Sequence, residues 1–288
     1  MAIELVTRYS PYVDELFTTE SKTSILTNKD FDFIGAKTVK VYKVGTAEMN
    51  DYGRNASLEG GLSRYGVPTD LTAETEAFTL TKDRSFTFVV DKLDEDETGN
   101  ALNPASALAR QLREVVVPEV DSYTLQKIIA GAGTTPEAAE LTAENIYDKI
   151  VSGTNALDNA EVPETGRVLV ITPDTYLLMK KCDDIVLETE TGANMRITGV
   201  IGNLDGMTVL KVPAARLPQG FGFAIVHPSA TVGVEKLADY STHINPPGIN
   251  GALVEGRICY DAFVLENKTK AIYYQAKTVE QAADPTEP

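Results

Sequence analysis

The residues best suited to chemistry are two histidines, two cysteines and a run of carboxylates, and their surroundings decide what chemistry they could do. His227 stands before Pro228, and His243 lies in STHINPPGING, a stretch with two adjacent prolines. Neither histidine has a serine or cysteine motif beside it, which nucleophilic catalysis would require. We therefore expect ordinary loop or strand-end positions for both.

Metal binding is disfavoured at the two places where the residue types would suit it. Cys182 and Cys259 have no Cys or His partner at metal-ligand spacing, so we expect buried thiols. The stretch DKLDEDETGN crowds carboxylates around one lysine. Counting from Asp91 as the first position of a calcium loop, however, puts Leu93 third and Leu102 twelfth, where oxygen ligands are needed. We expect a solvated acidic turn there, with no metal or other cofactor.

Known catalytic motifs are missing as well. The sequence has no G-x-S-x-G nucleophile elbow, no phosphate loop ending in Gly-Lys-Ser or Gly-Lys-Thr, and no H-E-x-x-H helix. The segment GVIGNLDG resembles a nucleotide loop only loosely, because it lacks a third glycine at the required spacing and a helix signal after it. We predict a protein that is not an enzyme, and keep a soluble enzyme with an unrecognised site as an alternative.

The composition narrows the classes of partner. The 288 residues include 42 acidic and 26 basic side chains, which give a net charge of -16. This charge makes nonspecific attraction to nucleic acid or to an anionic membrane unfavourable over most of the surface. No segment approaches the roughly 18 uninterrupted apolar residues that span a bilayer, and MAIELVTRYS lacks the pattern of a signal peptide. We expect a soluble, unsecreted protein with no membrane partner.

The element that must position everything else is a long helix predicted from Asn103 to Gly131. Asn103 can cap the first turn, Pro104 fits the first helical position, and Gly131 supplies a stop. Pro118 removes one backbone hydrogen bond and predicts a kink. Apolar residues recur at spacings of three and four, which predicts one buried face: Leu108, Leu112, Val115, Val116, Leu125, Ile128 and Ile129.

Before this helix, the pattern predicts an arm that ends in a strand and then a long β-hairpin. The strand signal is the alternation of apolar and polar residues in FDFIGAKTVKVYKVG. Residues 45–70 are rich in glycine and carry isolated apolar side chains without a periodic core face, so we expect a functional or mobile loop. The alternating segment FTLTKDRSFTFVVDKL then indicates a returning strand.

After the helix, the pattern indicates an α+β fold in which helices and strands are mixed. A second helix is expected from near Thr142, with Ile146, Ile150 and Val151 on one face. The remaining expectations follow in chain order: a buried strand at 167–171, a helix opened by Thr172 and Pro173, a strand pair around the Asp205-Gly206 turn, two extended segments in GFGFAIVHPSATVGVEKL, and a final strand pair at 254–265 and 271–275 joined by a turn at 267–270.

This order of elements resembles the major capsid protein of tailed bacteriophages, the Hong Kong 97-type fold. FTLTKDRSFTFVVDKLDEDET resembles the returning strand of the family's extended loop, which leads into its spine helix. RVLVITPDTYLLMKK resembles the strand and helix of the axial domain, and GRICYDAFVLENKTKAIYY resembles late strands of the peripheral domain. The resemblance covers most of residues 30–275.

The resemblance implies a domain organisation, which we state as an expectation: an N-terminal arm and first strand at 1–44, an extended loop at 45–90, a peripheral domain with the spine helix at 91–135, an axial domain at 136–245, return strands of the peripheral domain at 246–277, and a disordered tail at 278–288. In the family the extended loop lies over an adjacent subunit. Our candidates for that contact are Tyr52, Arg54, Leu58, Glu59, Leu62, Arg64, Tyr65 and Phe78.

The resemblance also implies a structural function and a set of partners. The chain would self-assemble as hexamers and pentamers into an icosahedral head that encloses double-stranded DNA without reading its sequence, and it would do so in the host bacterial cytoplasm before residing in the virion. Residues 50–81 contain no lysine for the covalent crosslink of some relatives, so noncovalent assembly is expected. A separate scaffolding protein and a portal are expected partners. An encapsulin-like shell, which encloses protein cargo, is the closest alternative.

Overall fold

The computed structural model describes residues 21–28, 38–54, 64–65, 70–71, 73–97, 103–182 and 201–278. The chain divides into two compact units: residues 33–80 form one, which we call the hairpin unit, and the remaining residues form the other, which we call the body. Apart from Thr278, the predicted tail at 278–288 lies outside the described residues, as does most of the N-terminal arm.

The hairpin unit is built on two antiparallel strands, β1 (Thr38–Val44) and β2 (Ala73–Thr79). Thr38 faces Thr79 at one end of the ladder and Val44 faces Ala73 at the other. The sequence places the returning strand of the hairpin as far as residue 90, and this boundary is wrong. The pairing of β2 with β1 ends at Thr79, because the chain beyond Leu80 joins a sheet of the body.

That sheet has three antiparallel strands, β3 (Lys82–Asp91), β9 (Gly251–Val264) and β8 (Thr231–Ile244), in this order. Every residue of β3 pairs with β9, so residues 82–90 leave the predicted extended loop. Strand β8 likewise pairs with β9 rather than joining the predicted axial domain. The reason is burial: alternate residues of β9 and the aromatic rings of β3 face one apolar cluster, which includes Val254, Ile258, Phe86 and Phe88.

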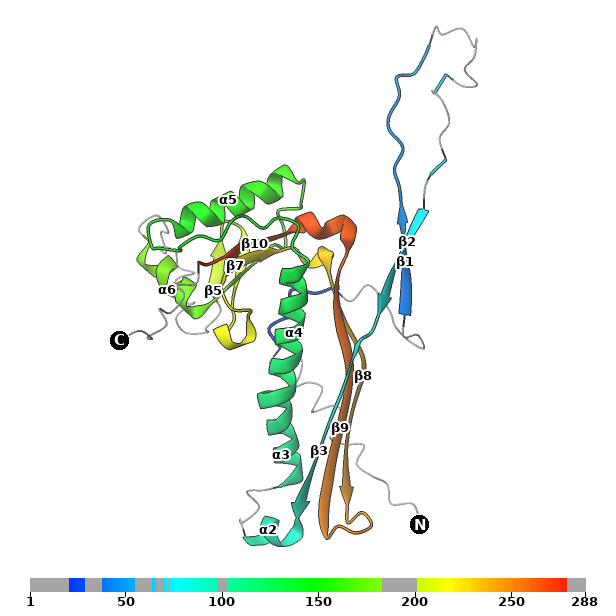
Figure 1. Ribbon diagram of the computed structural model, residues 1–288, viewed down its shortest axis with the longest axis vertical. Helices are drawn as coiled ribbons and strands as arrows, with labels where there is room; N and C mark the ends of the chain where they lie inside the picture. The colour runs from blue at the N-terminus through cyan, green and yellow to red at the C-terminus, as the bar shows by residue number, and fades with distance from the viewer. Residues whose placement is uncertain are drawn as a thin grey trace, which may run out of the picture. The chain divides into compact units, whose positions relative to one another are not determined.

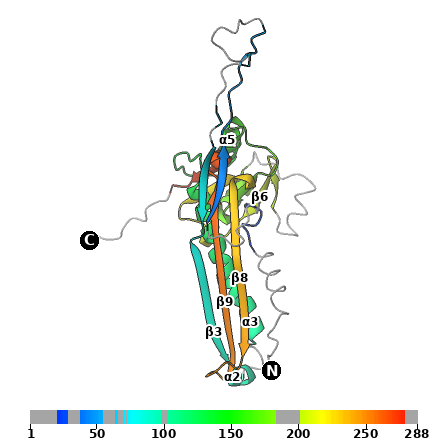
Figure 2. The same cartoon turned by 90° about the vertical axis from the view of Figure 1, so that its right-hand side faces the viewer.

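The predicted spine runs along this sheet in three segments, α3 (Pro104–Gln111), the π-helical turn η1 (Leu112–Val116) and α4 (Val117–Ala130) (Figures 1 and 2). The side-chain oxygen of Asn103 accepts a hydrogen bond from the N–H of Ala105 at 3.0 Å. Leu108, Leu112 and Val116 pack against the sheet, whereas Val115, expected on the apolar face, is exposed.

The region around Pro118 is arranged differently from the simple kink that the sequence predicts. The turn before it widens, and the N–H of Val117 donates to the carbonyl of Leu112, five residues earlier. A π turn of this kind lets the helix continue past a residue that lacks an N–H. A second difference precedes the spine: the predicted acidic turn forms a short helix, α2 (Lys92–Glu97).

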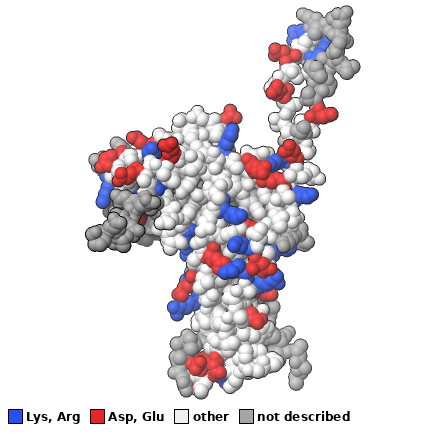
Figure 3. Space-filling model, viewed as in Figure 1, with Lys and Arg blue, Asp and Glu red and all other residues white. Residues whose placement is uncertain are grey.

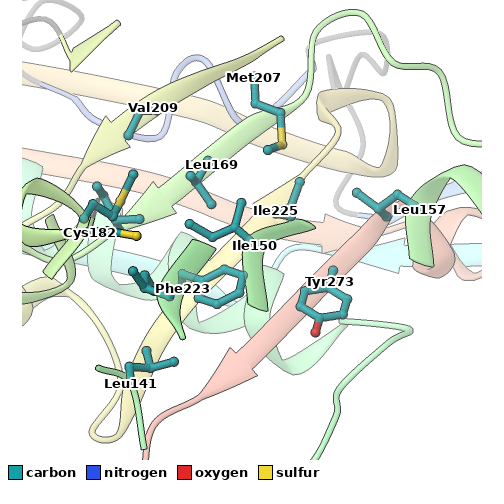
Figure 4. Packing of buried hydrophobic residues seen from close by; sticks show 13 residues of the cluster. Leu141, Ile150, Leu157, Leu169, Cys182, Met207, Val209, Phe223, Ile225 and Tyr273 are labelled. Atoms are coloured by element: carbon teal, nitrogen blue, oxygen red, sulfur yellow. The ribbon is translucent and has the colours of Figure 1, made fainter. Parts of the chain in front are cut away.

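A mixed five-stranded sheet makes up the rest of the body, in the order β10 (Ile272–Ala276), β7 (Phe221–Val226), β4 (Val168–Ile171), β6 (Met207–Lys211) and β5 (Ile201–Leu204). Only β4 and β6 run parallel. The helices α5 (Ile146–Asn159) and α6 (Pro173–Lys181) lie on one face (Figure 1). Their apolar residues meet those of the strands in one cluster, in which Ile150, Leu169, Phe223 and Tyr273 converge (Figure 4).

The opposite face of this sheet packs on the spine, because Leu125 and Ile128 of α4 share a second cluster with Val170, Ala224 and other strand residues. Two predictions about this region are wrong. Strand β10 pairs with β7 and not with the strand that precedes it in the chain, since the 3₁₀ turn η4 (Glu266–Ala271) carries the chain from one sheet to the other. Val151, expected on the buried face of α5, is exposed.

Several local predictions are confirmed. Thr172 caps α6, with its hydroxyl accepting from the N–H of Thr175, and Pro173 occupies the first turn. Asp205 and Gly206 form the turn between β5 and β6 with φ angles of 51° and 74°, the left-handed region that such a hairpin needs. The predicted class, a mixture of helices and sheets, is the observed one.

Candidate subunit interface

The hairpin unit keeps one register well beyond its strands. Gly53 lies fifteen positions after Thr38 and Arg64 lies fifteen positions before Thr79, so the pairing of Thr38 with Thr79 predicts that Gly53 faces Arg64. The N–H of Gly53 donates to the carbonyl of Arg64 at 3.0 Å, as this register requires. The two arms of the loop are therefore held side by side at this point, which we call the distal pair.

Large apolar side chains are exposed around the distal pair. Tyr52 is 51% exposed and Tyr65 is 77% exposed, although the two rings contact each other edge to face across the hairpin. Tyr42, Met49 and Leu71 are exposed as well. A two-stranded hairpin buries too little on its own surface to be more than marginally stable in water. An exposed apolar surface of this kind is typical of a segment that a partner covers.

The two strands of the hairpin unit carry charges of opposite sign. Strand β1 carries Lys40 and Lys43, and strand β2 carries Glu74 and Glu76. Lys43 Nζ lies 3.6 Å from Glu76 Oε2, so this pair stabilises the register electrostatically. Both arginines near the distal pair, at positions 54 and 64, are exposed.

The predicted contact residues fall into three groups. Tyr52, Arg54, Arg64 and Tyr65 come together at the distal pair. Leu58, Glu59 and Leu62 lie outside the described residues. Phe78, the last candidate, is only 4% exposed and faces Val39 across the ladder, so it is not available to a neighbour in this conformation. Tyr42 was missed, although its alternation with Val41 in β1 already placed it on the opposite face from that valine.

The residues suited to chemistry have structural surroundings. His227 begins the short 3₁₀ turn η3 (Pro228–Ala230), with Nδ1 lying 2.7 Å from Ser229 Oγ and Nε2 lying 3.1 Å from the carbonyl of Thr165. His243 lies next to the last residue of β8, a strand-end position as expected, and its Nε2 is 3.6 Å from Glu255 Oε2. Cys182 is buried as expected, whereas Cys259 is only half-buried.

Among the described residues, a cavity beside α6 and the acidic helix α2 are two further places whose residue types could suit chemistry. A cavity of about 420 Å³ is lined by Thr172 and Thr175, but their hydroxyls bond to each other and to the carbonyl of Gly222. Within the described ranges, no three His, Cys, Asp or Glu side chains are placed to hold a metal ion. The carboxylates of α2 form one acidic group near the end of the body (Figure 3). In the same ranges, no helix has the length and apolar character that a bilayer crossing needs.

Several solved structures share this fold. The chain is similar to one from Mycobacterium phage Che8, with a TM-score of 0.70 and 19% identity, over 88% of this chain and 90% of that chain. It is also similar to the capsid of Ralstonia phage GP4, with a TM-score of 0.64 and 9% identity, over 100% and 95%. A virus-like particle from Pyrococcus furiosus has a TM-score of 0.55 and 13% identity, over 93% and 100%.

The family follows from the sequence comparison. The search of curated proteins finds no match. A family model described as phage capsid protein matches residues 72–274, which is well over half of the chain. The match includes strands β2 to β9 in full and the beginning of β10. The chain therefore belongs to the phage capsid protein family, whose members are structural proteins of the virion.

Proposed function

We propose that the chain is the major capsid protein of a tailed phage, and that its copies form the hexamers and pentamers of an icosahedral head around double-stranded DNA. The observation that carries this proposal is the hairpin unit, which has the same register at its two strands and at the distal pair while leaving large apolar side chains exposed. A segment that is ordered in register but not buried in its own chain is suited to a neighbouring copy.

The distal pair is the proposed contact. Tyr52 and Tyr65 would supply the apolar area, because large aromatic rings dominate the energy of protein interfaces. Arg54 and Arg64 would then set which acidic groups of the neighbour they meet, and so fix orientation more than affinity. Strand β1 of the hairpin unit carries Lys40 and Lys43, which lie outside residues 50–81, the range without a lysine for a covalent crosslink. Lys43 is paired with Glu76, and noncovalent assembly stays our proposal.

The remaining partners follow from the same reading. We propose a separate scaffolding protein and a portal, with assembly in the host bacterial cytoplasm. The DNA would be enclosed without base-specific contacts, and the net charge of -16 supports this, because an acidic subunit does not hold phosphates tightly. An encapsulin-like shell is the alternative with the same fold, and a soluble enzyme with an unrecognised site is the other.

Sedimentation velocity of the purified chain, with negative-stain imaging of the fast fraction, tests the proposal. We expect shells, capsomer rings or curved sheets from the full chain, and small species from a variant that lacks residues 53–66. Unchanged near-ultraviolet circular dichroism of the variant would show that the body is folded. An unchanged oligomeric state after this deletion contradicts the proposal and favours the enzyme. Particles purified from infected cells that hold protein cargo and no DNA would favour the encapsulin-like alternative.

A further inference from the structure

One buried carboxylate holds the segment that precedes the hairpin unit. Asp121, on α4, is fully buried at 0% exposure. Its Oδ1 accepts from the hydroxyls of Ser21 at 2.9 Å and Thr23 at 2.8 Å, and its Oδ2 accepts from the N–H of Lys22 at 2.9 Å. Arg216 Nη1 lies 2.8 Å from the same Oδ2 and completes the charge pair. We call this set the entry anchor.

The same segment is fixed again a few residues later. Leu26 is fully buried among the residues of the sheet and α4. The N–H of Asn28 donates to the carbonyl of Thr231 at 2.8 Å, and the N–H of Gly233 donates back to the carbonyl of Asn28 at 3.2 Å. The chain is therefore tied to β8 at Asn28, the last described residue before the hairpin unit.

A second buried carboxylate holds the residue that follows the hairpin unit. Asp261, on β9, is 3% exposed. Its Oδ2 accepts from both the N–H and the hydroxyl of Thr81 at 2.8 Å. Its Oδ1 accepts from the hydroxyl of Tyr123 and from the N–H of Ala262, again at 2.8 Å. We call this set the exit anchor, because Thr81 is the first residue of the body after the hairpin unit.

The two anchors meet on one helix. Asp121 and Tyr123 are two positions apart on α4, so this helix takes part in fixing the chain both before and after the hairpin unit. Burying a carboxylate costs several kilocalories per mole unless charges and donors compensate, and an apolar side chain of similar volume would often stabilise the fold as well or better. Two compensated carboxylates at these two points therefore indicate selection for geometry more than for stability.

We propose that Asp121 and Asp261 are positioning residues that hold the chain on both sides of the hairpin unit, at residues 21–23 and at Thr81, and thereby restrict the freedom of the hairpin before assembly. This inference rests on the proposed function, in which the hairpin lies over a neighbouring copy. A segment whose freedom is already restricted loses less conformational entropy when it binds. The anchors then lower the concentration at which subunits assemble.

Spin-label distances in unassembled subunits test the positioning directly. One label is placed at Tyr42→Cys on β1 and one at Leu177→Cys on α6, both exposed positions, in a Cys259→Ser background. Thr81→Val removes the hydroxyl donor of the exit anchor, and Ser21→Ala with Thr23→Val removes two donors of the entry anchor. Thr87→Val is the matched control, because Thr87 is an exposed threonine on β3, the strand that begins directly after Thr81.

We expect the distance distribution to broaden about twofold in each anchor variant. The threshold concentration for assembly should rise about tenfold, because the released segment loses more conformational entropy when it binds. The control should match the parent. Asp261→Asn should broaden the distribution more than Thr81→Val does, because the NH2 group of the amide then faces groups that are themselves donors. This comparison requires that the Asp261→Asn variant folds. Thr81→Val and the pair Ser21→Ala with Thr23→Val keep the shape of their sites, so they test the inference even if Asp261→Asn does not fold.

Two results would overturn the inference: anchor variants with the same distribution as Thr87→Val, or a broadened distribution with an unchanged assembly threshold. The failure of the proposed function looks different. In that case the distance distributions broaden as expected in the anchor variants, but Tyr52 is as accessible in assembled shells as in the free subunit. This result would confirm that the anchors restrict the hairpin and refute the role of the hairpin in covering a neighbour.

Discussion

Tyr52 packs edge to face against Tyr65 across the hairpin, with the ring centroids 5.0 Å apart and the planes at 67°. The contact lies next to the hydrogen bond between Gly53 and Arg64 and therefore belongs to the same register as the strands. An aromatic pair of this geometry contributes about 0.5–1.5 kcal/mol beyond the area it buries. Half or more of each ring remains exposed, so the pair orders the hairpin without using up its apolar surface.

The first prediction concerns this pair. Changing Tyr52 and Tyr65 together to serine removes the exposed aromatic area at the distal pair. We expect thermal unfolding of the body to be unchanged, because exposed substitutions away from the core usually alter stability by less than about 0.5 kcal/mol. Assembly measured by sedimentation velocity should be strongly weakened. Leu177→Ser, at an exposed position on α6, is the control, and an equal loss of assembly in both variants would argue against a special role for the hairpin.

The second prediction concerns the close approach of the spine to β9. A Cβ added at Gly131 would lie 2.6 Å from Val264 Cγ2. The backbone there has a φ of -90°, so the requirement for glycine is steric and not conformational. Gly131→Ala should lower the free energy of unfolding by about 1–3 kcal/mol, the usual range for overpacking.

Adding Val264→Gly to that variant gives the control, because it removes the Val264 Cβ, which the new Cβ would meet at 2.7 Å, together with both methyl groups. We expect urea denaturation to show the double variant more stable than the sum of the two single changes predicts. Strict additivity of the two free-energy changes would mean that Gly131 and Val264 do not interact in this way.

The third prediction compares a buried ion pair with an exposed one. Arg216 is paired with buried Asp121, whereas Arg257 is paired with Asp83 on the open face of the three-stranded sheet. Removing one partner of a buried pair leaves an uncompensated charge, at a cost of about 3–5 kcal/mol. Because Asp121 keeps three other donors and Arg216 is partly exposed, we expect Arg216→Met to cost about 3 kcal/mol or somewhat less.

Arg257→Met is the matched comparison, with the same change of side chain in a solvent-screened pair. Its midpoint of urea unfolding should coincide with that of the parent. If both variants lost the same stability, burial of Asp121 would have no energetic consequence, and the entry anchor would need another explanation.

The features that the sequence predicts correctly are those that neighbouring residues determine. The cap at Thr172 and the turn at Asp205 and Gly206 depend on interactions within a few positions, and both are observed. The partners of strands are determined by distant residues. Nothing within residues 78–90 says that pairing changes from β1 to β9 at Leu80, because both strands favour the same alternating pattern.

For the candidate interface, the sequence indicated where the hairpin lies, and its contact with a neighbouring copy stays a prediction. Glycine and isolated aromatics marked the hairpin, and the distal pair falls within the expected loop. The two anchors were not predicted, since Asp121 and Asp261 look like any surface carboxylates in an acidic chain. Their burial depends on donors about 100 and 180 positions away, in Ser21 and Thr81. Only the position of Asp121 among the apolar residues of the spine gave a hint.

The last prediction is a loss of stability in alkali. Burial raises the pKa of Tyr260 above the ordinary value of 10.0, and the nearby Glu119 carboxylate, which accepts from its hydroxyl at 3.3 Å, adds to the shift. Burial also raises the pKa of Tyr273 and of Tyr274. In the unfolded chain these phenols ionise near pH 10.0, whereas in the folded protein their ionisation is moved to higher pH.

The sign of the effect follows from this difference. Below pH 10.0 both states hold the proton, so the stability is fully present; above it the unfolded state releases protons that the folded state keeps, and the free energy of unfolding falls. At one pH unit above the unfolded pKa the loss is up to about 1.4 kcal/mol for Tyr260. Urea unfolding measured from about pH 8, below the unfolded pKa, to about pH 11, above it, should show this decline. Tyr260→Phe should make the decline with pH less steep, because one of the three raised pKa values is removed. A slope equal to that of the parent would show that Tyr260 ionises as readily in the folded protein as in the unfolded chain.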